Sequence, residues 1–148
     1  MVANDGWKNS VARRARIRDG LIASNKGHKA RVRITNDVAT IALKSRKRGL
    51  VRDEFEYVIP LNDAEEMLRT MCDGNVLDKV RHFVSDASNI WQVDVYEGLL
   101  DGVVLAEIEL TDADQILTLP DWILADVTAD ATYRKINMVA ARLAKTTL

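Results

Sequence analysis

The amino-acid sequence predicts one α+β domain built mainly from antiparallel strands, and three observations lead to this prediction. Apolar and charged residues alternate along several short runs, as they do in half-buried strands. Short polar connections join these runs, which favours antiparallel pairing of neighbours. A few segments carry apolar residues at helical spacing, and no internal repeat or linker divides the 148 residues. We therefore expect a single domain over residues 1–148.

The N-terminal part of the chain predicts a short helix followed by a strand. Asp5 can cap a helix that contains Trp7 and Val11. The run IRDGLIAS, which begins at Ile17, alternates as a strand does but contains Gly20. Because glycine weakens a strand interior, we expect the strand to be broken there.

A hairpin and a helix are predicted next. The runs KARVRIT and VATIALK flank Asn36-Asp37, a tight-turn signal, and form the clearest hairpin of the chain. The run RDEFEYVI is the next expected strand and stops before Pro60. Asn62 or Asp63 then caps a helix that ends near Cys72, with apolar residues at helical spacing.

The second half of the chain predicts a meander and a final helix. The runs VLDKVRHFV, IWQVDVYEG and GVVLAEIEL alternate and are joined by short polar segments. The pattern changes after Leu110, where TDADQIL predicts a short capped helix and Pro120-Asp121-Trp122 predicts a turn. The last segment, ATYRKINMVAARLA, has apolar residues at roughly helical spacing.

Composition excludes several classes of protein. The formal net charge is −1, which argues against a general nucleic-acid-binding surface. A single cysteine, Cys72, excludes an internal disulfide and a multi-cysteine zinc site, and a buried inert thiol is expected. No stretch approaches the ~20 apolar residues of a membrane span, and no signal peptide is evident. A cytoplasmic protein is the expectation.

The charged residues of the predicted strands are spaced two apart and sorted by sign. Basic pairs occur at Arg31 and Arg33 and at Lys79 and Arg81, whereas an acidic pair occurs at Glu107 and Glu109. An ordinary solvent-facing sheet surface, the alternative for any single strand, mixes signs and includes Ser, Thr and Gln. We therefore expect the helices to cover the apolar faces from outside, with the charged faces turned inward.

Closing such a sheet into a barrel would remove its edges and leave a charged lumen. Unpaired buried charges cost several kcal/mol each, so the lumen must hold water, ions and a highly charged ligand. Arginine and lysine bind phosphate oxygens, and carboxylates hold Mg²⁺ or Mn²⁺. A polyphosphate with its metal ion fits this arrangement.

The order of the motifs resembles the CYTH superfamily, the triphosphate tunnel metalloenzymes. The motifs are R-V-R, an x-L-K strand end at Lys44, R-x-E-F-E, K-x-R, W-x-V-D-x-Y-x-G and L-A-E-I-E-L, followed by P-D-W and YRKIN. The resemblance covers nearly the whole chain from Trp7 onwards. It implies a closed antiparallel β-barrel, or tunnel, with helices packed outside, a triphosphate substrate and a divalent metal.

The resemblance also implies roles for individual residues. The phosphate-binding set would be Arg31, Arg33, Lys44, Arg52, Lys79, Arg81 and, from the C-terminal segment, Lys135. Glu107 and Glu109 would bind Mg²⁺ or Mn²⁺. Glu54, Glu56 and Asp94 would be further acidic tunnel residues that bind metal or position water. The implied reaction is metal-assisted hydrolysis of a small triphosphate, foremost inorganic tripolyphosphate.

One motif of the family is absent from the start of the sequence. Such proteins usually begin with a strand bearing E-x-E-x-K, whereas here Met1 directly precedes Val2. The resemblance therefore predicts a missing first strand and a barrel that is open at that point. Unpaired strand edges would favour a homodimer formed through the gap.

Two other functions stay open at this point. A class IV-type adenylyl cyclase would use the same triphosphate grip on ATP and would add an adenine pocket. A polyphosphate- or nucleotide-binding module would have lost catalysis together with the first strand. The sequence shows no Ser/His/Asp arrangement and no Gly-rich phosphate loop, so it supports neither covalent catalysis nor a P-loop. His28 and His82 are expected to have no catalytic role.

Overall fold

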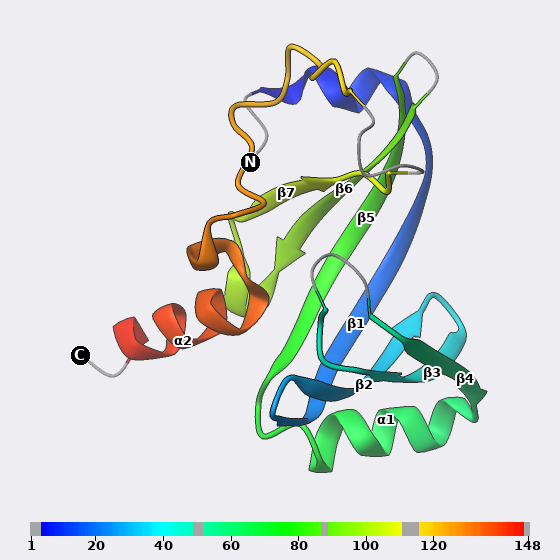
Figure 1. Cartoon of the computed structure of the whole chain (residues 1–148). Coiled ribbons are helices and arrows are strands. Elements are labelled where there is room, and N and C mark those ends of the chain that lie inside the picture. The colour runs from blue at the N-terminus through cyan, green and yellow to red at the C-terminus, as the bar shows by residue number, and fades with distance from the viewer. Residues whose placement is uncertain (1–3, 49–51, 87–88, 111–115, 147–148) are drawn as a thin grey trace. The chain divides into compact units, whose positions relative to one another are not determined.

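The structure is a computed structural model that describes residues 4–48, 52–86, 89–110 and 116–146 (Figure 1). Its strands are β1 (Val11–Asn25), β2 (His28–Thr35), β3 (Val38–Lys44), β4 (Glu54–Ile59), β5 (Val76–Asp86), β6 (Asn89–Glu97) and β7 (Val104–Glu107). Its helices are α1 (Leu61–Thr70) and α2 (Lys135–Thr146), with 3₁₀ turns at Asp5–Ser10, Gly98–Leu100 and Ala131–Tyr133.

The strands are hydrogen-bonded in the order β4-β3-β2-β1-β5-β6-β7. The pairings of β1 with β2, β2 with β3, β3 with β4 and β6 with β7 are all antiparallel. The predicted α+β class with an antiparallel sheet is therefore confirmed. The closed tunnel that the resemblance implies is absent among the described residues, because β4 and β7 are the two ends of a linear strand order, and this agrees with the opening expected from the sequence. The cause expected for the opening, a missing first strand, stays a prediction.

The chain divides into two compact units, which are described separately. One unit comprises Arg16–Asp78, and the other comprises Met1–Ala15 with Lys79–Leu148. Both β1 and β5 run from one unit into the other.

The β1–β2 and β2–β3 turns of the Arg16–Asp78 unit use left-handed backbone conformations. Lys26 and Gly27 adopt positive φ angles of 47° and 88° between β1 and β2. Asn36, with φ 52°, begins the predicted hairpin turn between β2 and β3, and its side chain accepts a hydrogen bond from the backbone N–H of Arg16. Asparagine tolerates this left-handed conformation better than most residues do. The predicted hairpin is confirmed.

Helix α1 covers the apolar face of these strands (Figure 1). Val32, Ile34 and Ala39 of the sheet form a core with Ala64, Leu68 and Cys72. Cys72 is buried as expected, and burial raises the pKa of its thiol. The predicted cap of the helix was wrong, since α1 begins directly after Pro60 and has no side-chain cap. Pro60 occupies the N-cap position, and its side chain has no oxygen that could accept a hydrogen bond from the first turn.

Strand β1 continues through Gly20, so the predicted break at that residue was wrong. The glycine instead lets α1 approach the sheet closely. A Cβ atom at position 20 would lie 2.4 Å from Sγ of Cys72 and 2.8 Å from Cδ2 of Leu68. Glycine is therefore required by packing and not by a turn.

Gly20→Ala is expected to lower the free energy of unfolding by about 1–3 kcal/mol, because the added methyl group overpacks the core beneath α1. Urea unfolding would measure this change. Combining it with Cys72→Ala, which removes the nearest clashing atom, should recover part of the loss. A Gly20→Ala variant as stable as the unmodified chain would contradict the close packing of α1 at this position.

The second unit contains an aromatic core. Trp7, Trp91 and Trp122 are buried together with Val84 and Val93, as expected for packing residues. The rings of Trp91 and Trp122 meet edge to face at 5.7 Å between centroids. This core fixes the 3₁₀ turn at the N-terminus against β5 and β6.

Four further expectations for this unit have different outcomes. Asn4, and not Asp5, caps the first turn, through a 2.7 Å hydrogen bond from the backbone N–H of Gly6. The predicted turn after Pro120 is present, since its carbonyl accepts from the N–H of Ile123. The helix expected over TDADQIL falls largely on residues 111–115, which lie outside the described residues. The C-terminal helix is present as α2. Among the described residues, no helix has the length and apolarity needed to cross a membrane.

Candidate functional site

The charged face of the Arg16–Asp78 unit lies on the side of the strands opposite α1. Arg31 and Arg33 flank Val32 on β2, and Val32 is part of the core beneath α1. Successive side chains of a strand point to opposite faces, so both arginines lie on the other face. The register places Asp19 of β1 directly opposite Arg33. This cross-strand pairing brings one carboxylate against two guanidinium groups.

Asp19 holds both arginines, and we call this arrangement the Asp19 clamp (Asp19, Arg31 and Arg33). Arg31 donates from Nε to Oδ1 of Asp19 at 2.7 Å, and its Nη2 lies 2.5 Å from the same oxygen. Arg33 donates to Oδ2 from Nε at 3.2 Å and from Nη2 at 2.7 Å. The side chain of Asp19 is 2% exposed, whereas those of Arg31 and Arg33 are 16% and 31% exposed. The carboxylate is buried and the arginines reach solvent.

The other charged residues of this face lie on β3 and β4. Lys44 is opposite Glu54 and its Nζ lies 2.6 Å from Oε1 of that residue. The hydrogen bond from Lys44 is the main cause that lowers the pKa of Glu54. Glu56 is exposed and opposite Ala42, and Arg52 lies just before β4, where its charge also lowers the pKa of Glu54.

The second unit contains a similar arrangement, the Asp94 clamp (Asp94, Lys79 and Arg81). Lys79 and Arg81 are two apart on β5, and Asp94 is on β6. Arg81 donates to Asp94 from Nε at 2.6 Å and from Nη2 at 2.7 Å, while Lys79 donates to Oδ2. Lys79 and Asp94 are fully buried. Arg81 also donates to Oε1 of Gln92 and, at 3.1 Å, to Glu107.

The protonation of the Asp94 clamp is shaped by burial and by its own charges. Burial raises the pKa of Asp94, but the bonds and charges of Arg81 and Lys79 outweigh it, so the net pKa is lowered. Burial, followed by the positive charge of Lys135 at the start of α2, lowers the pKa of Lys79 to about 8. Lys79 is therefore a buried amine whose pKa of about 8 lies below the ordinary value for lysine.

The two predicted metal ligands lie at and beyond the end of β7. Glu107 is the last residue of the strand, its side chain is 49% exposed, and it accepts from Arg81. Glu109 is exposed and outside the strand. Among the described residues, no group of three or more His, Cys, Asp and Glu side chains is placed to hold a metal ion. Mg²⁺ is nevertheless commonly bound by one or two carboxylates together with substrate phosphates and water. Two accessible glutamates fit such a donor set.

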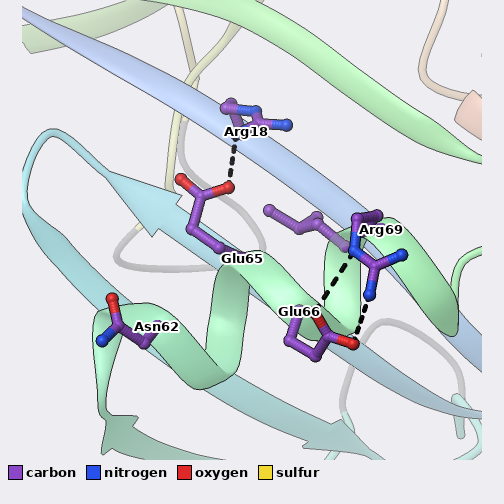
Figure 2. A pocket seen from close by; sticks show the side chains of 6 residues that line it. Arg18, Asn62, Glu65, Glu66 and Arg69 are labelled. Carbon is purple, nitrogen blue, oxygen red and sulfur yellow. Dashed lines mark hydrogen bonds and ion pairs between the residues drawn. The ribbon is translucent and has the colours of Figure 1, made fainter.

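A surface pocket of about 380 Å³ lies elsewhere in the Arg16–Asp78 unit, between β1 and α1 (Figure 2). Figure 2 shows Arg18 reaching toward Glu65, and Arg69 bonded to Glu66 on the same helix. Arg18 and Arg69 are therefore each paired with a carboxylate of α1. The pocket is on the α1 face and is separate from the Asp19 clamp, so we do not assign the function to it.

Sequence reasoning missed two residues that the structure places in these clusters, Asp19 and Gln92. Asp19 carried a signal, because aspartate is depleted in strands and here stands in an apolar run beside a hairpin with two arginines. The pairing that brings it opposite Arg33 depends on register, which the run IRDGLIAS did not define. Gln92 is two residues before Asp94, so its face could have been inferred, but an amide in a strand carries little functional information.

Comparison with known proteins supports a common origin. The chain is 37% identical over 139 residues to an inorganic triphosphatase of Acetivibrio thermocellus, a match covering 94% of this chain and 88% of that protein. It is 32% identical over 97 residues to an inorganic triphosphatase of Nitrosomonas europaea, covering 64% of this chain and 63% of that protein. No protein-family model matches.

Solved structures support the fold. A crystal structure of an inorganic triphosphatase matches with a TM-score of 0.66 and 23% identity over 86% of each chain. A second crystal structure of that protein matches with a TM-score of 0.65 and 24% identity, covering 88% of this chain and 86% of that chain. At this level of identity the likeness concerns the arrangement of the strands and helices.

Proposed function

Since the chain belongs to the inorganic triphosphatase family, we propose that it hydrolyses inorganic tripolyphosphate. Water would attack a terminal phosphorus in line, the phosphorus–oxygen bond to the rest of the chain would break, and orthophosphate and pyrophosphate would leave. The observation that carries the proposal is the 37% identity over 94% of the chain to an inorganic triphosphatase. The Asp19 and Asp94 clamps support it, because Arg31, Arg33 and Arg81 are ordered basic groups with some exposed surface, and such groups suit phosphate oxygens.

Basic residues in each unit, taken separately, would bind phosphate. Arg31 and Arg33 are held through Nε and Nη2, so their Nη1 nitrogens are not engaged by Asp19. A guanidinium group has five N–H donors, which leaves donors for phosphate oxygens. The full proposed set is Arg31, Arg33, Lys44, Arg52, Lys79, Arg81 and Lys135.

Glu107 and Glu109 would hold Mg²⁺ or Mn²⁺ together with phosphate oxygens of the substrate. The metal, when bound, withdraws negative charge from the phosphates. Glu107 accepts a hydrogen bond from Arg81 in this structure. When phosphate binds to Arg81, a phosphate oxygen would replace Glu107 as the acceptor of this bond, and Glu107 would be released.

Glu54 and Glu56 are the candidates for orienting the attacking water. The carboxylate of Glu54 has a lowered pKa and is therefore ionised at neutral pH. Glu56 lies two residues further along β4 and is exposed. Asp94 was expected to bind metal or to position water. Its contacts favour another role, because its two oxygens accept hydrogen bonds from Lys79 and Arg81. We propose that Asp94 holds these two cations for phosphate.

Phosphate release from tripolyphosphate, with Mg²⁺, with Mn²⁺ and with a chelator, tests the proposal. ATP and thiamine triphosphate are parallel substrates, and cyclic AMP is measured in the ATP reaction. We expect metal-dependent release that is fastest with tripolyphosphate. Cyclic AMP formation would favour the cyclase alternative, and binding of tripolyphosphate without release would favour the binding module.

The pH dependence of substrate binding follows from Lys79. Its pKa of about 8 lies below the ordinary value of 10.5, so the amine is charged below pH 8 and neutral above it. A neutral amine loses its ionic attraction for phosphate, so KM for tripolyphosphate should rise as the pH increases through about 8. The measurement is KM against pH.

Lys135→Gln tests whether Lys79 is the titrating group. The readout is the midpoint of the KM profile and not the size of KM, because Lys135 also belongs to the proposed phosphate-binding set. Removing the positive charge of Lys135, which lowers the pKa of Lys79, should move the midpoint of the KM profile to higher pH. A midpoint that stays in place would assign the titration to another group.

Three further expectations remain proposals. A charged lumen beside the strands and a homodimer formed through free strand edges follow from the family resemblance, and the linear strand order with ends at β4 and β7 leaves two edges for such pairing. A light-scattering mass equal to one chain at high protein concentration would contradict the dimer. A cytoplasmic location is the third, and it agrees with a chain whose one cysteine, Cys72, is free in the structure.

A further inference from the structure

Asp19 is buried, charged and shared by two basic residues, and the reaction as proposed above assigns it no role. Its side chain is 2% exposed, although it lies on the charged face of the unit. Ionised aspartate is rarely buried to this extent unless it is paired, because removing a carboxylate from water is costly. Here each of its oxygens serves one arginine. The position therefore combines a buried anion with two cations that reach solvent.

The geometry orients the arginines in the same way. Both are contacted by Asp19 through the Nε and Nη2 side of the guanidinium group. This side is one edge of a rigid planar fork, so fixing it also fixes the direction of the opposite edge, which carries Nη1. With 16% and 31% of their side chains exposed, Arg31 and Arg33 can present that edge to a ligand.

The backbone beneath Asp19 is fixed from the other side of the sheet. The next residue, Gly20, faces α1, where an added Cβ would lie 2.4 Å from Sγ of Cys72. The cross-strand partner of Gly20 is Val32, which is fully buried. In the sequence Val32 stands between the two arginines. The strand carrying the carboxylate and the strand carrying the arginines therefore pack against the same core.

We infer that Asp19 is a positioning residue for substrate binding, which aims Arg31 and Arg33 at adjacent oxygens of a polyphosphate. This inference rests on the proposed function. The clamp carries two positive charges and one negative charge, so it keeps a net charge of +1 that attracts an anion. Asp19 itself does not touch the phosphate, and it acts through the two arginines.

The sign of one substitution effect separates positioning from simple charge balance. Asp19→Asn keeps the size of the side chain and raises the net charge of the clamp by one. If Asp19 only neutralised its surroundings, the variant would bind tripolyphosphate more tightly, because the site would be more positive. If Asp19 aims the arginines, the variant binds more weakly despite the added positive charge.

The experiment is calorimetric titration of the full chain with tripolyphosphate in the presence of a chelator, so that no turnover occurs. We expect Asp19→Asn to raise Kd at least tenfold, and the matched control Asp37→Asn, which removes the same charge from the exposed turn after β2, to change Kd less than twofold. In an Arg31→Ala, Arg33→Ala background, Asp19→Asn should no longer weaken binding. Equal or tighter binding by Asp19→Asn would overturn the inference.

A measurement on the unmodified chain covers the case in which Asp19→Asn does not fold. The ¹⁵Nε–H signals of Arg31 and Arg33 should exchange with solvent more slowly than that of exposed Arg46. Adding tripolyphosphate should leave this protection intact while the Nη signals shift. Loss of Nε protection on binding would show that the clamp opens, and would overturn the inference.

The two proposals fail in distinguishable ways. If the unmodified chain neither binds nor hydrolyses tripolyphosphate, the proposed function fails. If it does both, and Asp19→Asn binds at least as tightly, only the role of Asp19 fails.

Discussion

Replacing Asp94 by asparagine is expected to lower the free energy of unfolding by about 3–5 kcal/mol, the usual cost of removing one partner from a buried ion pair. The substitution would leave Lys79 buried without its counter-charge and would remove the bidentate partner of Arg81. Lys79 can respond by releasing its proton, because its pKa, about 8 with Asp94 present, falls further when Asp94 no longer raises it, but arginine stays charged. The destabilisation should therefore be smaller above pH 8 than at pH 7.

Urea unfolding at both pH values would measure this effect. Asp5→Asn is the matched control, because Asp5 also forms an ion pair with a lysine, Lys8 at 2.8 Å, but both side chains are largely exposed. An exposed pair is worth about 0–1 kcal/mol, so this control should unfold almost as the unmodified chain does. Equal losses in the two variants would contradict the burial of the Asp94 clamp.

Glu107→Gln is expected to abolish metal-dependent phosphate release while leaving the fold intact. A metal ion contributes several kcal/mol to stabilising the charge of a phosphoryl-transfer transition state, so the loss of a ligand should reduce kcat/KM by roughly 100-fold or more. The fold should tolerate the change, because the side chain is half exposed and the bond it accepts from Arg81 is a surface interaction.

Activity and thermal unfolding of the same protein preparation would test both parts. Glu66→Gln is the control, since Glu66 is an exposed glutamate paired with an arginine, Arg69, on α1 and away from the charged face. Its activity should be unchanged. Undiminished turnover by Glu107→Gln would remove this residue from the mechanism, and a large loss of thermal stability would show a structural role instead.

Much of the fold follows from alternation of apolar and charged residues. Alternation predicted the hairpin β2–β3 and the strands β5, β6 and β7. A strand with one apolar face has an apolar residue at every second position, and this repeat is visible in the sequence. Pairing residues two apart also placed Arg31 with Arg33, and Lys79 with Arg81, on common faces. The covering of the apolar face by α1 follows from the same logic.

Other features could not be read from local patterns. Gly20 is a break signal by itself, and only the approach of α1 in three dimensions shows why a glycine continues the strand there. The helix after Pro60 begins without a side-chain cap, so a rule based on capping residues placed its start too late. Whether the strand order closes depends on pairing between strands distant in sequence, which alternation does not encode.

The site was predictable in its cations more than in its anions. Arginine and lysine repeated along a strand are conspicuous, whereas Asp19 and Asp94 acquire their roles from cross-strand partners. Asp94 has the same residue type as a metal ligand or a water-orienting group. Its two basic neighbours indicate a different role, and their contact is set by the pairing of β5 with β6.

The two clamps have a consequence for the thermodynamics of association. A long basic side chain that becomes ordered only when its ligand arrives loses about 0.5–1.5 kcal/mol of rotamer entropy at that moment. In this chain Arg31, Arg33, Lys79 and Arg81 are already held by carboxylates in the ligand-free state, so that entropy is lost during folding. An anion that binds either clamp therefore meets side chains that are already ordered, and its binding should carry a small conformational-entropy penalty.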